Sequence, residues 1–427
     1  MTPAPRPPKL VVETREIDPI DDLVPFADPR EPLAWLRRGD GIIGLGQVTG
    51  YEHGPQTPPD APSPATAWRL IAAEAEIDDA VGVPGTGLVA FGTLVFDARS
   101  QATSLLTVPE VVVGRRDGRA WVTRIRTVGS DVPERAPEPI PFGPHWSATL
   151  GPGALDRAGY QAAVRAGLDA ISTGEVAKVV LARDLVGTVP AGADLRRLVR
   201  ALATDYPDTW TYAVDGMIGA SPETLVTVSG GTVTARVLAG TTPRGADATE
   251  DATARGALAA SAKDLDEHRY AVRSVLETLA PHTSTLRSDP DPFTLELPNL
   301  WHLATDVAGE IADHASALDL VAALHPTAAV AGTPTDAALD AIHRIEPFDR
   351  GRYAGPVGWV DANGDGEWAI ALRCAQIGSA PDRRFAAYSD TIPIIAYAGA
   401  GIVAGSDPEA ELLETRVKFR PIVDALA

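Results

Sequence analysis

Residues 392–418 read IPIIAYAGAGIVAGSDPEAELLETRVK. The first part is apolar and predicts a buried strand over 394–398. The pair Asp407-Pro408 offers a capping side chain and a proline for the first turn, and the pattern after it predicts a helix over 408–425. This stretch therefore predicts a strand that leads into a C-terminal helix.

The same stretch contains a glycine motif. Residues 399–404, GAGIVA, satisfy G-x-G-x-x-A after an apolar strand, a pattern typical of dinucleotide-binding folds. That fold also needs a second strand carrying a ribose-binding acid, and only the helix up to Ala427 follows here. We therefore expect a tight turn, or backbone amides that approach an anion, and no NAD or FAD site.

Upstream, the chain predicts many helices and strands without regular alternation. The helices are predicted over 156–172, 193–206, 252–279, 315–324 and 337–345. The strands are predicted over 177–185, 211–217, 225–228, 232–237, 355–360, 367–376 and 384–388. No internal repeat has a fixed period. This order predicts one large α+β body, with layered β-sheets flanked by helices, and not a doubly wound parallel sheet.

One proline-rich segment divides the chain. Five prolines lie between Pro133 and Pro144, and Gly151-Pro152-Gly153 follows. Residues 1–150 alternate short apolar pieces with turn residues. Strands are predicted over 10–12, 41–48, 88–96, 110–113 and 121–125. We expect residues 1–150 to be a mostly β part of the same body, and residues 151–427 to carry the functional site.

Composition excludes several classes of protein. The 427 residues are 45% hydrophobic and 22% charged, which is typical of a folded globular chain, and the net charge is −20. So acidic a chain is not expected to bind nucleic acid or an anionic membrane surface. The single cysteine, Cys374, excludes a disulfide framework and a zinc site built from thiolates. Because the N-terminus shows no signal peptide and the longest apolar run, 392–404, is too short to span a bilayer, we expect a cytoplasmic protein.

Two predicted helices each carry a pair of carboxylates. Asp264 and Glu267 are three residues apart, as are Glu411 and Glu414, with Lys418 one turn further on. Each pair shares a helix face. Two such faces could form an oxygen-only site of the kind that Mg²⁺ prefers. Because surface acid pairs are common, spacing alone favours solvated helix faces and does not establish a metal site.

A second acidic stretch has a simpler interpretation. Residues 361–366, DANGDG, begin like a calcium-binding loop, but Leu372 occupies the twelfth position, where a bidentate carboxylate is needed. Strand-like residues flank the stretch. We therefore expect a hairpin turn.

Several polar residues lie in apolar surroundings: Lys178, Glu223, His302, His325 and Arg373. Lys178 could be a lysine at a strand end whose amino group reaches solvent. Glu223 could be an exposed turn residue, and each histidine a hydrogen-bonded core residue. Arg373 lies within a predicted strand and would need an anion as partner. Each is also a candidate site residue.

These pieces, in this order, resemble the chorismate-utilising enzymes, the family of anthranilate, aminodeoxychorismate, isochorismate and salicylate synthases. The matching segments are KVVLAR (178–183), ASPETLV (220–226), LAGTTPRG (238–245), KDLDEH (263–268), LWHLAT (300–305), LHPTAAVAGTP (324–334), EPFDRGRYAGPVGW (346–359), GDGEWAIALRCA (364–375) and YAGAGIVAGSDPEAELLETRVK (397–418). The likeness covers roughly residues 155–425, while the first 150 residues match no motif of the family. It implies a body like anthranilate synthase component I, in which residues 151–427 form the chorismate-binding catalytic region.

The resemblance implies a role for each candidate residue. Mg²⁺ would be held by Glu267 and Glu414, with Asp264 and Glu411 in support. Lys178 would be the general base that activates water for attack at C2 of chorismate. Glu223 would be the general acid for the departing 4-hydroxyl, and His302, also assigned to catalysis, would lie against the ring substituents. The residues implied around the substrate carboxylates are Gly240, Thr241, Tyr353, Arg373, Gly399 and Lys418.

The nucleophile distinguishes members of this family. Ammonia-using members resemble this chain but carry Gln at the position of Lys178, and aminodeoxychorismate synthases place a lysine before the pair Gly240-Thr241. Both departures imply water as nucleophile and no glutamine amidotransferase subunit. LWHLAT and LHPTAAVAG resemble the isochorismate synthases of siderophore and menaquinone pathways, although Ala328 and Thr242-Pro243 depart from the family pattern. We therefore expect an isochorismate synthase that is a monomer or weak dimer, with salicylate synthase as the alternative. A scaffold protein that kept the fold without the chemistry is a further alternative.

Overall fold

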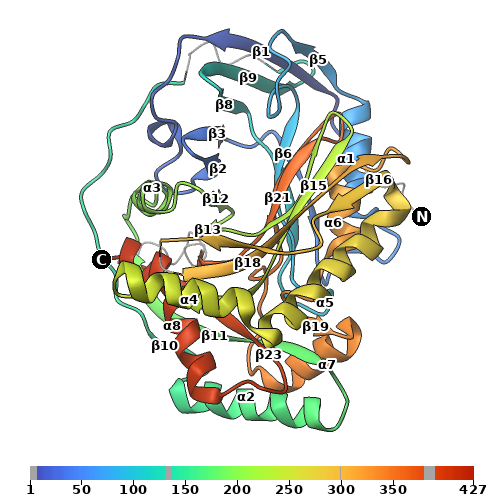
Figure 1. The fold of residues 1–427 in the computed structure, drawn as a ribbon. Helices are drawn as coiled ribbons and strands as arrows, with labels where there is room; N and C mark the ends of the chain where they lie inside the picture. Colours follow the sequence, from blue (N-terminus) through green and yellow to red (C-terminus); the bar gives the residue numbers. More distant parts are fainter. Residues whose placement is uncertain (1–6, 131–136, 299, 379–389) are drawn as a thin grey trace.

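Two large β-sheets pack against each other and are surrounded by helices (Figure 1). The computed structural model describes residues 7–130, 137–298, 300–378 and 390–427. Within those residues every strand pair is antiparallel except β1 with β5. The predicted α+β class with layered sheets is confirmed.

The first sheet has 13 strands within the described residues. Its order is β10 (Gly151–Pro152), β11 (Lys178–Pro190), β23 (Thr391–Ile402), β22 (Cys374–Ile377), β13 (Met217–Ser221), β12 (Trp210–Val214), β2 (Leu33–Arg37), β3 (Asp40–Leu45), β8 (Val111–Arg116), β9 (Arg119–Thr127), β1 (Leu10–Ile17) and β5 (Glu76–Asp79). The short β19 (Gly332–Thr333) also pairs with β11.

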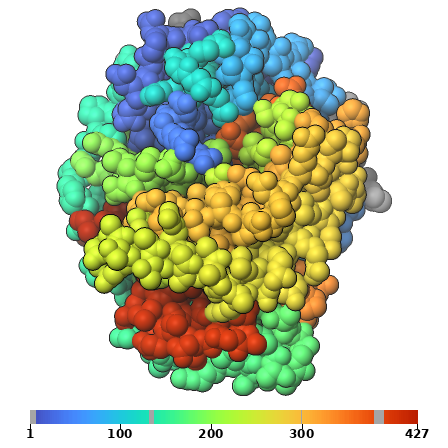
Figure 2. Space-filling model, viewed as in Figure 1, coloured from blue at the N-terminus to red at the C-terminus, as the bar shows by residue number. Residues whose placement is uncertain are grey.

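The second sheet has 10 strands within the described residues. Its order is β16 (Thr283–Ser288), β18 (Leu300–Ile311), β15 (Thr232–Pro243), β14 (Thr224–Ser229), β21 (Gly366–Ile370), β20 (Pro356–Asp361), β6 (Val89–Thr93), β7 (Ser104–Val108) and β4 (Thr49–His53). β17 (Phe293–Glu296) pairs with β18. Both sheets thus contain strands from before and after the proline-rich segment. In the space-filling view the N-terminal part, in blue, lies directly against later segments in green and orange (Figure 2).

Aromatic residues and one buried carboxylate join the sheets. Trp35 in β2 stacks on Trp210 in β12 with 5.0 Å between ring centroids. The indole nitrogens of Trp35 and Trp359 both donate to Oε2 of Glu367, at 2.9 and 3.1 Å. Arg116 donates to the other oxygen, at 2.9 Å. Because three donors satisfy this carboxylate, it can be buried between the sheets.

Eight α-helices lie within the described residues: α1 (Pro64–Ala73), α2 (Arg157–Ser172), α3 (Arg196–Asp205), α4 (Ala248–Ala260), α5 (Ala262–Leu279), α6 (Ala317–Leu324), α7 (Thr335–Ile345) and α8 (Pro408–Ala425). Six of these eight helices, all but α3 and α7, begin at a residue whose side chain caps the first turn. The Asp407 side chain accepts hydrogen bonds from the first-turn amides of α8, and Asp156 does the same for α2. No helix in these ranges combines the length and apolar character needed to cross a membrane.

Several predicted elements differ from the structure. The predicted helix 252–279 is wrong as one element, because Ser261 adopts an extended conformation that ends α4 and caps α5. The predicted strand 367–376 is two strands in different sheets, and Arg373, at φ +49°, lies where the chain crosses between them. The predicted strand 384–388 lies outside the described residues. The N-terminal part also contains a helix, α1, that was not predicted.

The sequence predicted a turn in each of two glycine-rich stretches, and the structure has a turn in one of them. Residues 361–365 form the hairpin turn between β20 and β21, where Asp361 accepts hydrogen bonds from the amides of Asn363 and Asp365. The hairpin prediction is therefore confirmed. Gly399 and Gly401 lie inside β23, paired with β11, so the expectation of a tight turn there is wrong.

Candidate active site

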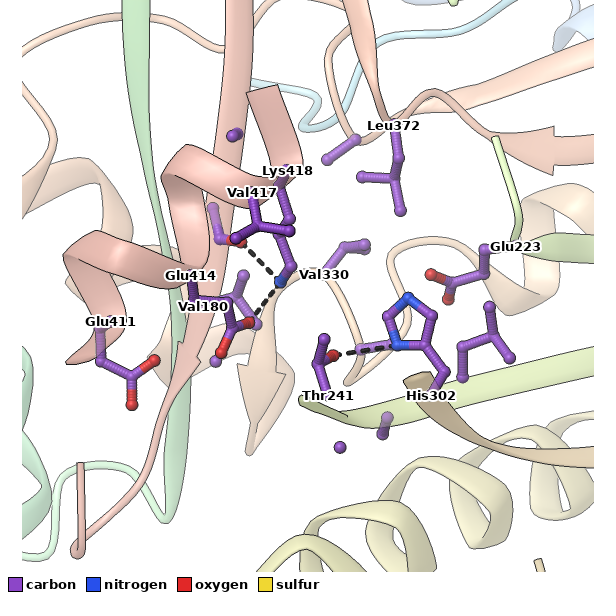
Figure 3. Close-up of a pocket in the computed structure, with 18 of the residues that line it drawn as sticks. Val180, Glu223, Thr241, His302, Val330, Leu372, Glu411, Glu414, Val417 and Lys418 are labelled. Carbon is purple, nitrogen blue, oxygen red and sulfur yellow. Dashed lines mark hydrogen bonds and ion pairs between the residues drawn. The ribbon is translucent and has the colours of Figure 1, made fainter. Parts of the chain in front are cut away.

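All of the predicted site residues line a single cavity of about 440 Å³. Strands β11 and β23 of the first sheet and β15 and β18 of the second contribute walls, together with α5 and α8. In Figure 3, Glu411, Glu414 and Lys418 lie on one side, and Glu223 and His302 lie on the other. The elements that were far apart in the sequence are thus brought to one place.

Lys178 and Glu267 form a buried ion pair. The Lys178 amino nitrogen lies 2.8 Å from Oε1 of Glu267, and their side chains are 5% and 13% exposed. Burial alone would raise the pKa of Glu267, but the charge and hydrogen bond of Lys178 outweigh it and lower the pKa. The interpretation of Lys178 as an exposed strand-end lysine is wrong.

The glycine motif has a steric reason. A Cβ on Gly401 would lie 2.8 Å from the Glu267 carboxylate and 3.1 Å from Cε of Lys178. A Cβ on Gly399 would lie 2.8 Å from the backbone oxygen of Leu181. Glycine in β23 therefore lets the strand approach the ion pair closely.

Helices α5 and α8 present their carboxylates to the cavity beside lysines. Lys418 contacts Oε1 of Glu414 at 2.5 Å and donates to the backbone oxygen of Gly399 at 2.9 Å. Lys263, in α5, lies 3.7 Å from Glu411 in α8. The two helices thus face each other across the cavity through charged side chains.

The other two carboxyl groups that these helices present to the cavity, those of Asp264 and Glu411, have raised pKa values. Burial raises the pKa of Asp264, and the neighbouring charge of Glu267 adds to that rise, although the Ser261 hydroxyl opposes it. Burial, followed by the charge of Glu414, raises the pKa of Glu411. Such mutual repulsion in a partly buried cavity is relieved by a cation.

The donor chemistry fits a hard divalent cation. Oxygen-only carboxylates from two facing helices are ligands that Mg²⁺ prefers. Across the ranges that the structure describes, no three Asp, Glu, His or Cys side chains already form a metal-holding group. Instead, Glu267 contacts Lys178 and Glu414 contacts Lys418. To hold the ion, the two carboxylates would have to release these lysines.

Glu223 follows β13 and is buried rather than exposed, so the turn interpretation is wrong. Burial raises its pKa to about 7, and the charges of Lys178, Arg373 and Lys418 partly oppose the rise. A carboxyl group with this pKa is protonated often enough at neutral pH to donate a proton.

His302 is held between two neighbours. Its Nδ1 lies 2.9 Å from the hydroxyl oxygen of Thr241. Thr241 in β15 is the residue that pairs with His302 in β18. Its Nε2 lies 3.4 Å from NH2 of Arg373. Burial, and after it the charges of Arg373 and Lys418, lower the pKa of His302 well below its usual value. The pair Thr241–His302 is visible in Figure 3.

The backbone of β15 bends at Gly240, where φ is +81° and the pairing with β18 shifts register. A Cβ at this position would lie 3.0 Å from that of Asp264. The glycine therefore allows α5 to pack against the strand next to Thr241. His325, the other histidine noted in the sequence, does not line the cavity and donates to the backbone oxygen of Phe96 at 2.9 Å.

Other cavity residues were not predicted. Tyr397 stacks on Tyr353 with 4.9 Å between centroids, and Val330 and Leu372 add apolar wall. Arg350 also reaches the cavity and forms a buried ion pair with Glu346, with 2.6 Å between NH2 and Oε1. The two residues are four positions apart in the sequence, about one helical turn. That spacing was the only sequence signal for it.

Comparison with known proteins identifies relatives over most of the chain. A family model described as "Chorismate binding enzyme" matches residues 4–427. The isochorismate synthase DhbC of Bacillus subtilis is 42% identical over 279 residues, which are 62% of this chain and 67% of that protein. A Mycobacterium tuberculosis protein named MenF is 38% identical over 358 residues, covering 80% of this chain and 87% of that protein. The structure of MenF, the menaquinone-specific isochorismate synthase of Escherichia coli, superposes with a TM-score of 0.76 at 25% identity, covering 98% of this chain and 96% of that one.

Proposed function

The chain belongs to the chorismate binding enzyme family, and on that premise we propose that it is an isochorismate synthase, an isomerase that converts chorismate to isochorismate. The observation that carries this proposal is that a buried lysine, a carboxyl group with a pKa of about 7 and two pairs of carboxylates line one cavity. Relatives named isochorismate synthases support the same reaction.

The reaction needs a base and an acid. Water bonds to C2 of the ring, the double bond shifts, and the bond from C4 to its hydroxyl oxygen breaks. To take the proton from the attacking water, Lys178 must be neutral, so its ion pair with Glu267 has to be released first. We assign it this role because its amino group is buried at the cavity wall and Glu267 would hold Mg²⁺ instead. Glu223 gives its proton to the departing hydroxyl, so that one water enters and one leaves.

The substrate is a dicarboxylate, and the cavity offers cations and donors for it. We assign Arg373, Lys418, Thr241 and Tyr353 to the substrate carboxylates, with the backbone at Gly240 and Gly399. Glu267 and Glu414 would hold Mg²⁺, supported by Asp264 and Glu411. When bound, Mg²⁺ supplies positive charge that attracts and orients a substrate carboxylate.

Product analysis tests the proposal. Purified protein is incubated with chorismate and Mg²⁺, and products are separated by chromatography while pyruvate is measured in parallel. We expect isochorismate without pyruvate. Equal amounts of salicylate and pyruvate would instead identify a salicylate synthase.

A variant pair distinguishes catalysis from a scaffold role. Glu223→Gln should lose turnover, whereas Glu277→Gln, at an exposed position of α5, should keep it. If both variants convert chorismate like the parent protein, the assigned acid is wrong. If the parent converts no chorismate at all, the protein is a scaffold in this fold.

We further propose that the enzyme works in the cytoplasm, as a monomer or weak dimer, without a glutamine amidotransferase subunit. The position of Lys178 supports water over ammonia as nucleophile. Sedimentation of the purified chain measures its state of assembly, and unchanged product with added glutamine or ammonia would support independence from an amidotransferase.

A further inference from the structure

Three residues form a hydrogen-bonded row that ends at the cavity. NH2 of Arg373 lies 3.4 Å from Nε2 of His302, and Nδ1 of His302 lies 2.9 Å from Oγ1 of Thr241. His302 is 6% exposed and Arg373 is 8% exposed, so the protein and not bulk water determines these contacts. All three line the cavity.

Hydrogen-bond chemistry gives the row a direction. A guanidinium can only donate, so Nε2 of His302 must accept. The proton of a neutral imidazole then lies on Nδ1, which donates to the hydroxyl oxygen of Thr241. That oxygen is thereby an acceptor in this contact, and the hydroxyl hydrogen of Thr241 is left for another partner.

The opposite tautomer conflicts with the geometry. A proton on Nε2 would point at the N–H of Arg373, and Nδ1 would then accept the hydrogen of Thr241. An imidazolium would place a second positive charge against Arg373, in a buried position. Burial and the charges of Arg373 and Lys418 lower the pKa of His302 by more than the backbone carbonyl of Gly240 raises it, in agreement with a neutral ring.

We propose that His302 is a positioning residue, fixed by Arg373 as the Nδ1–H tautomer, which turns the Thr241 hydroxyl hydrogen into the cavity toward a carboxylate oxygen of the substrate. The inference rests on the proposed function for the identity of the substrate, but not for the tautomer. His302 thus acts through Thr241 rather than by transferring a proton itself. Arg373 has two roles, as a charge beside the substrate and as the donor that sets the ring.

Nuclear magnetic resonance tests the tautomer on the substrate-free protein. The full chain is labelled with ¹⁵N-histidine, and two-bond ¹H–¹⁵N correlations are recorded between pH 6 and 8. The His302 signals are identified by their loss in His302→Gln. We expect a protonated Nδ1, an unprotonated Nε2 and no titration of this ring; a protonated Nε2, or a charged ring, would overturn the proposal.

Kinetics test the dependence on Thr241. Thr241→Val removes the hydroxyl at nearly constant volume and should lower kcat/KM about 10- to 100-fold, while Thr241→Ser should stay within about threefold. His302→Asn keeps an N–H near the position of Nδ1 and should retain more kcat/KM than His302→Ala. Thermal unfolding of each variant is compared with the parent to identify variants that do not fold.

The double variant gives the decisive comparison. If His302 acts through Thr241, His302→Ala should cost little further kcat/KM once Thr241 is valine. Independent, multiplying losses would overturn the proposal. Failure of the proposed function is recognised separately. In that case product analysis would not find isochorismate after incubation with chorismate, while the imidazole signals of His302 would still be those of the Nδ1–H tautomer.

Discussion

At the scale of single residues, burial controls the chemistry of the cavity. Glu223 has its pKa raised to about 7 by burial, while Glu267, at a comparably buried place, has its pKa lowered. The difference is the partner: Glu267 contacts Lys178 at 2.8 Å, whereas the positive charges near Glu223 only partly offset its burial. One carboxyl is therefore suited to donate a proton and the other to stay ionised.

The first prediction concerns pH. Glu223 must be protonated to act as an acid, so its active fraction falls as pH rises through about 7. In saturating Mg²⁺, Glu223→Gln should be slower than the parent by about 10²- to 10⁴-fold at pH 6, and the ratio of parent to variant kcat/KM should fall above pH 7, approaching a tenfold loss per pH unit. The ratio is used because both proteins keep the base Lys178, whose neutral fraction rises over the same range. A ratio that stays flat to pH 9 would contradict the assignment.

Sequence reasoning found the site residues with unequal support. The three-residue spacing of the carboxylates in α5 and in α8 predicted that each pair lies on one helix face. The apolar surroundings of Lys178, Glu223 and Arg373 indicated candidate site residues, but their roles came only from the family resemblance, because their neighbours in space come from remote segments. The contact of Thr241 with His302 joins residues 61 positions apart, and no local pattern indicates it.

At the scale of elements, a helix break shapes the carboxylate site. Ser261 ends α4, caps α5 by accepting from the Asp264 amide, and also contacts the Asp264 carboxylate through its hydroxyl. Serine is compatible with a helix interior, so the pattern over 252–279 predicted one helix. The break became evident only from the backbone of Ser261 and its capping contact.

The second prediction follows from this cap. Ser261→Ala removes both contacts with Asp264 and should weaken the apparent Mg²⁺ affinity by about 10-fold, since partners of ligands orient them. Ser261→Thr keeps a capping hydroxyl and is the control. The measurement is activity as a function of free Mg²⁺. Equal affinity in both variants would mean that Asp264 does not depend on Ser261.

The third prediction concerns the buried ion pair of Glu346 with Arg350, which follows α7 and bonds to the backbone of β11. Glu346 accepts from Arg350 and also from the Ala182 amide at 2.7 Å, and Arg350 donates to the backbone oxygen of Val180. Glu346→Ala leaves a buried guanidinium unpaired and should destabilise the fold by about 3–5 kcal/mol. Glu277→Gln, in an exposed pair with Arg273, should not change stability measurably. Denaturant unfolding of both variants decides; similar midpoints would contradict the prediction.

At the scale of the whole molecule, the net charge of −20 and an anionic substrate are compatible. Four acidic residues belong to the proposed Mg²⁺ site, and Lys178, Lys263 and Lys418 each contact one of these carboxylates. With Arg350, Arg373 and Glu223 included, five basic and five acidic side chains line the cavity, so it is charge-balanced even though the molecule is acidic. The excess of acidic residues lies mainly outside the cavity. It is the reason that we expect no affinity for nucleic acid.

The fourth prediction is that chelation abolishes turnover without unfolding. The carboxylates lie on helices that pack on a large core, unlike a small domain nucleated by its metal. With EDTA, activity should disappear while circular dichroism and the thermal midpoint stay close to those of the untreated protein. Excess Mg²⁺ should restore activity. Loss of structure on chelation would contradict this view of the site.

The role of residues 1–150 could not be obtained from sequence. All five strand regions predicted there contain a strand. Which strands pair with each other depends on contacts far apart in the sequence, which the local pattern does not specify. The structure places β2 beside β12 and β6 beside β20. We therefore propose that residues 1–150 and 151–427 form one body rather than two independent domains.

The last prediction tests that proposal by cutting the chain. Residues 151–427 alone would leave the fully buried strands β12 and β20 with unpaired edges, and would expose Trp210 and Trp359. Such edges favour aggregation, so this fragment should be insoluble or bind a hydrophobic dye, and should convert no chorismate. Residues 137–150 form no helix or strand, but they contact both fragments, as in the hydrogen bonds from the Ile140 amide to Pro25 and from the Ala148 amide to Leu426. Because these contacts and the strand pairs can re-form when the fragments meet, producing residues 1–150 and 151–427 in the same cell should restore a soluble, active complex. If the longer fragment folds and works alone, the N-terminal strands are an addition to a complete catalytic domain, and the shared sheets are not required for its stability.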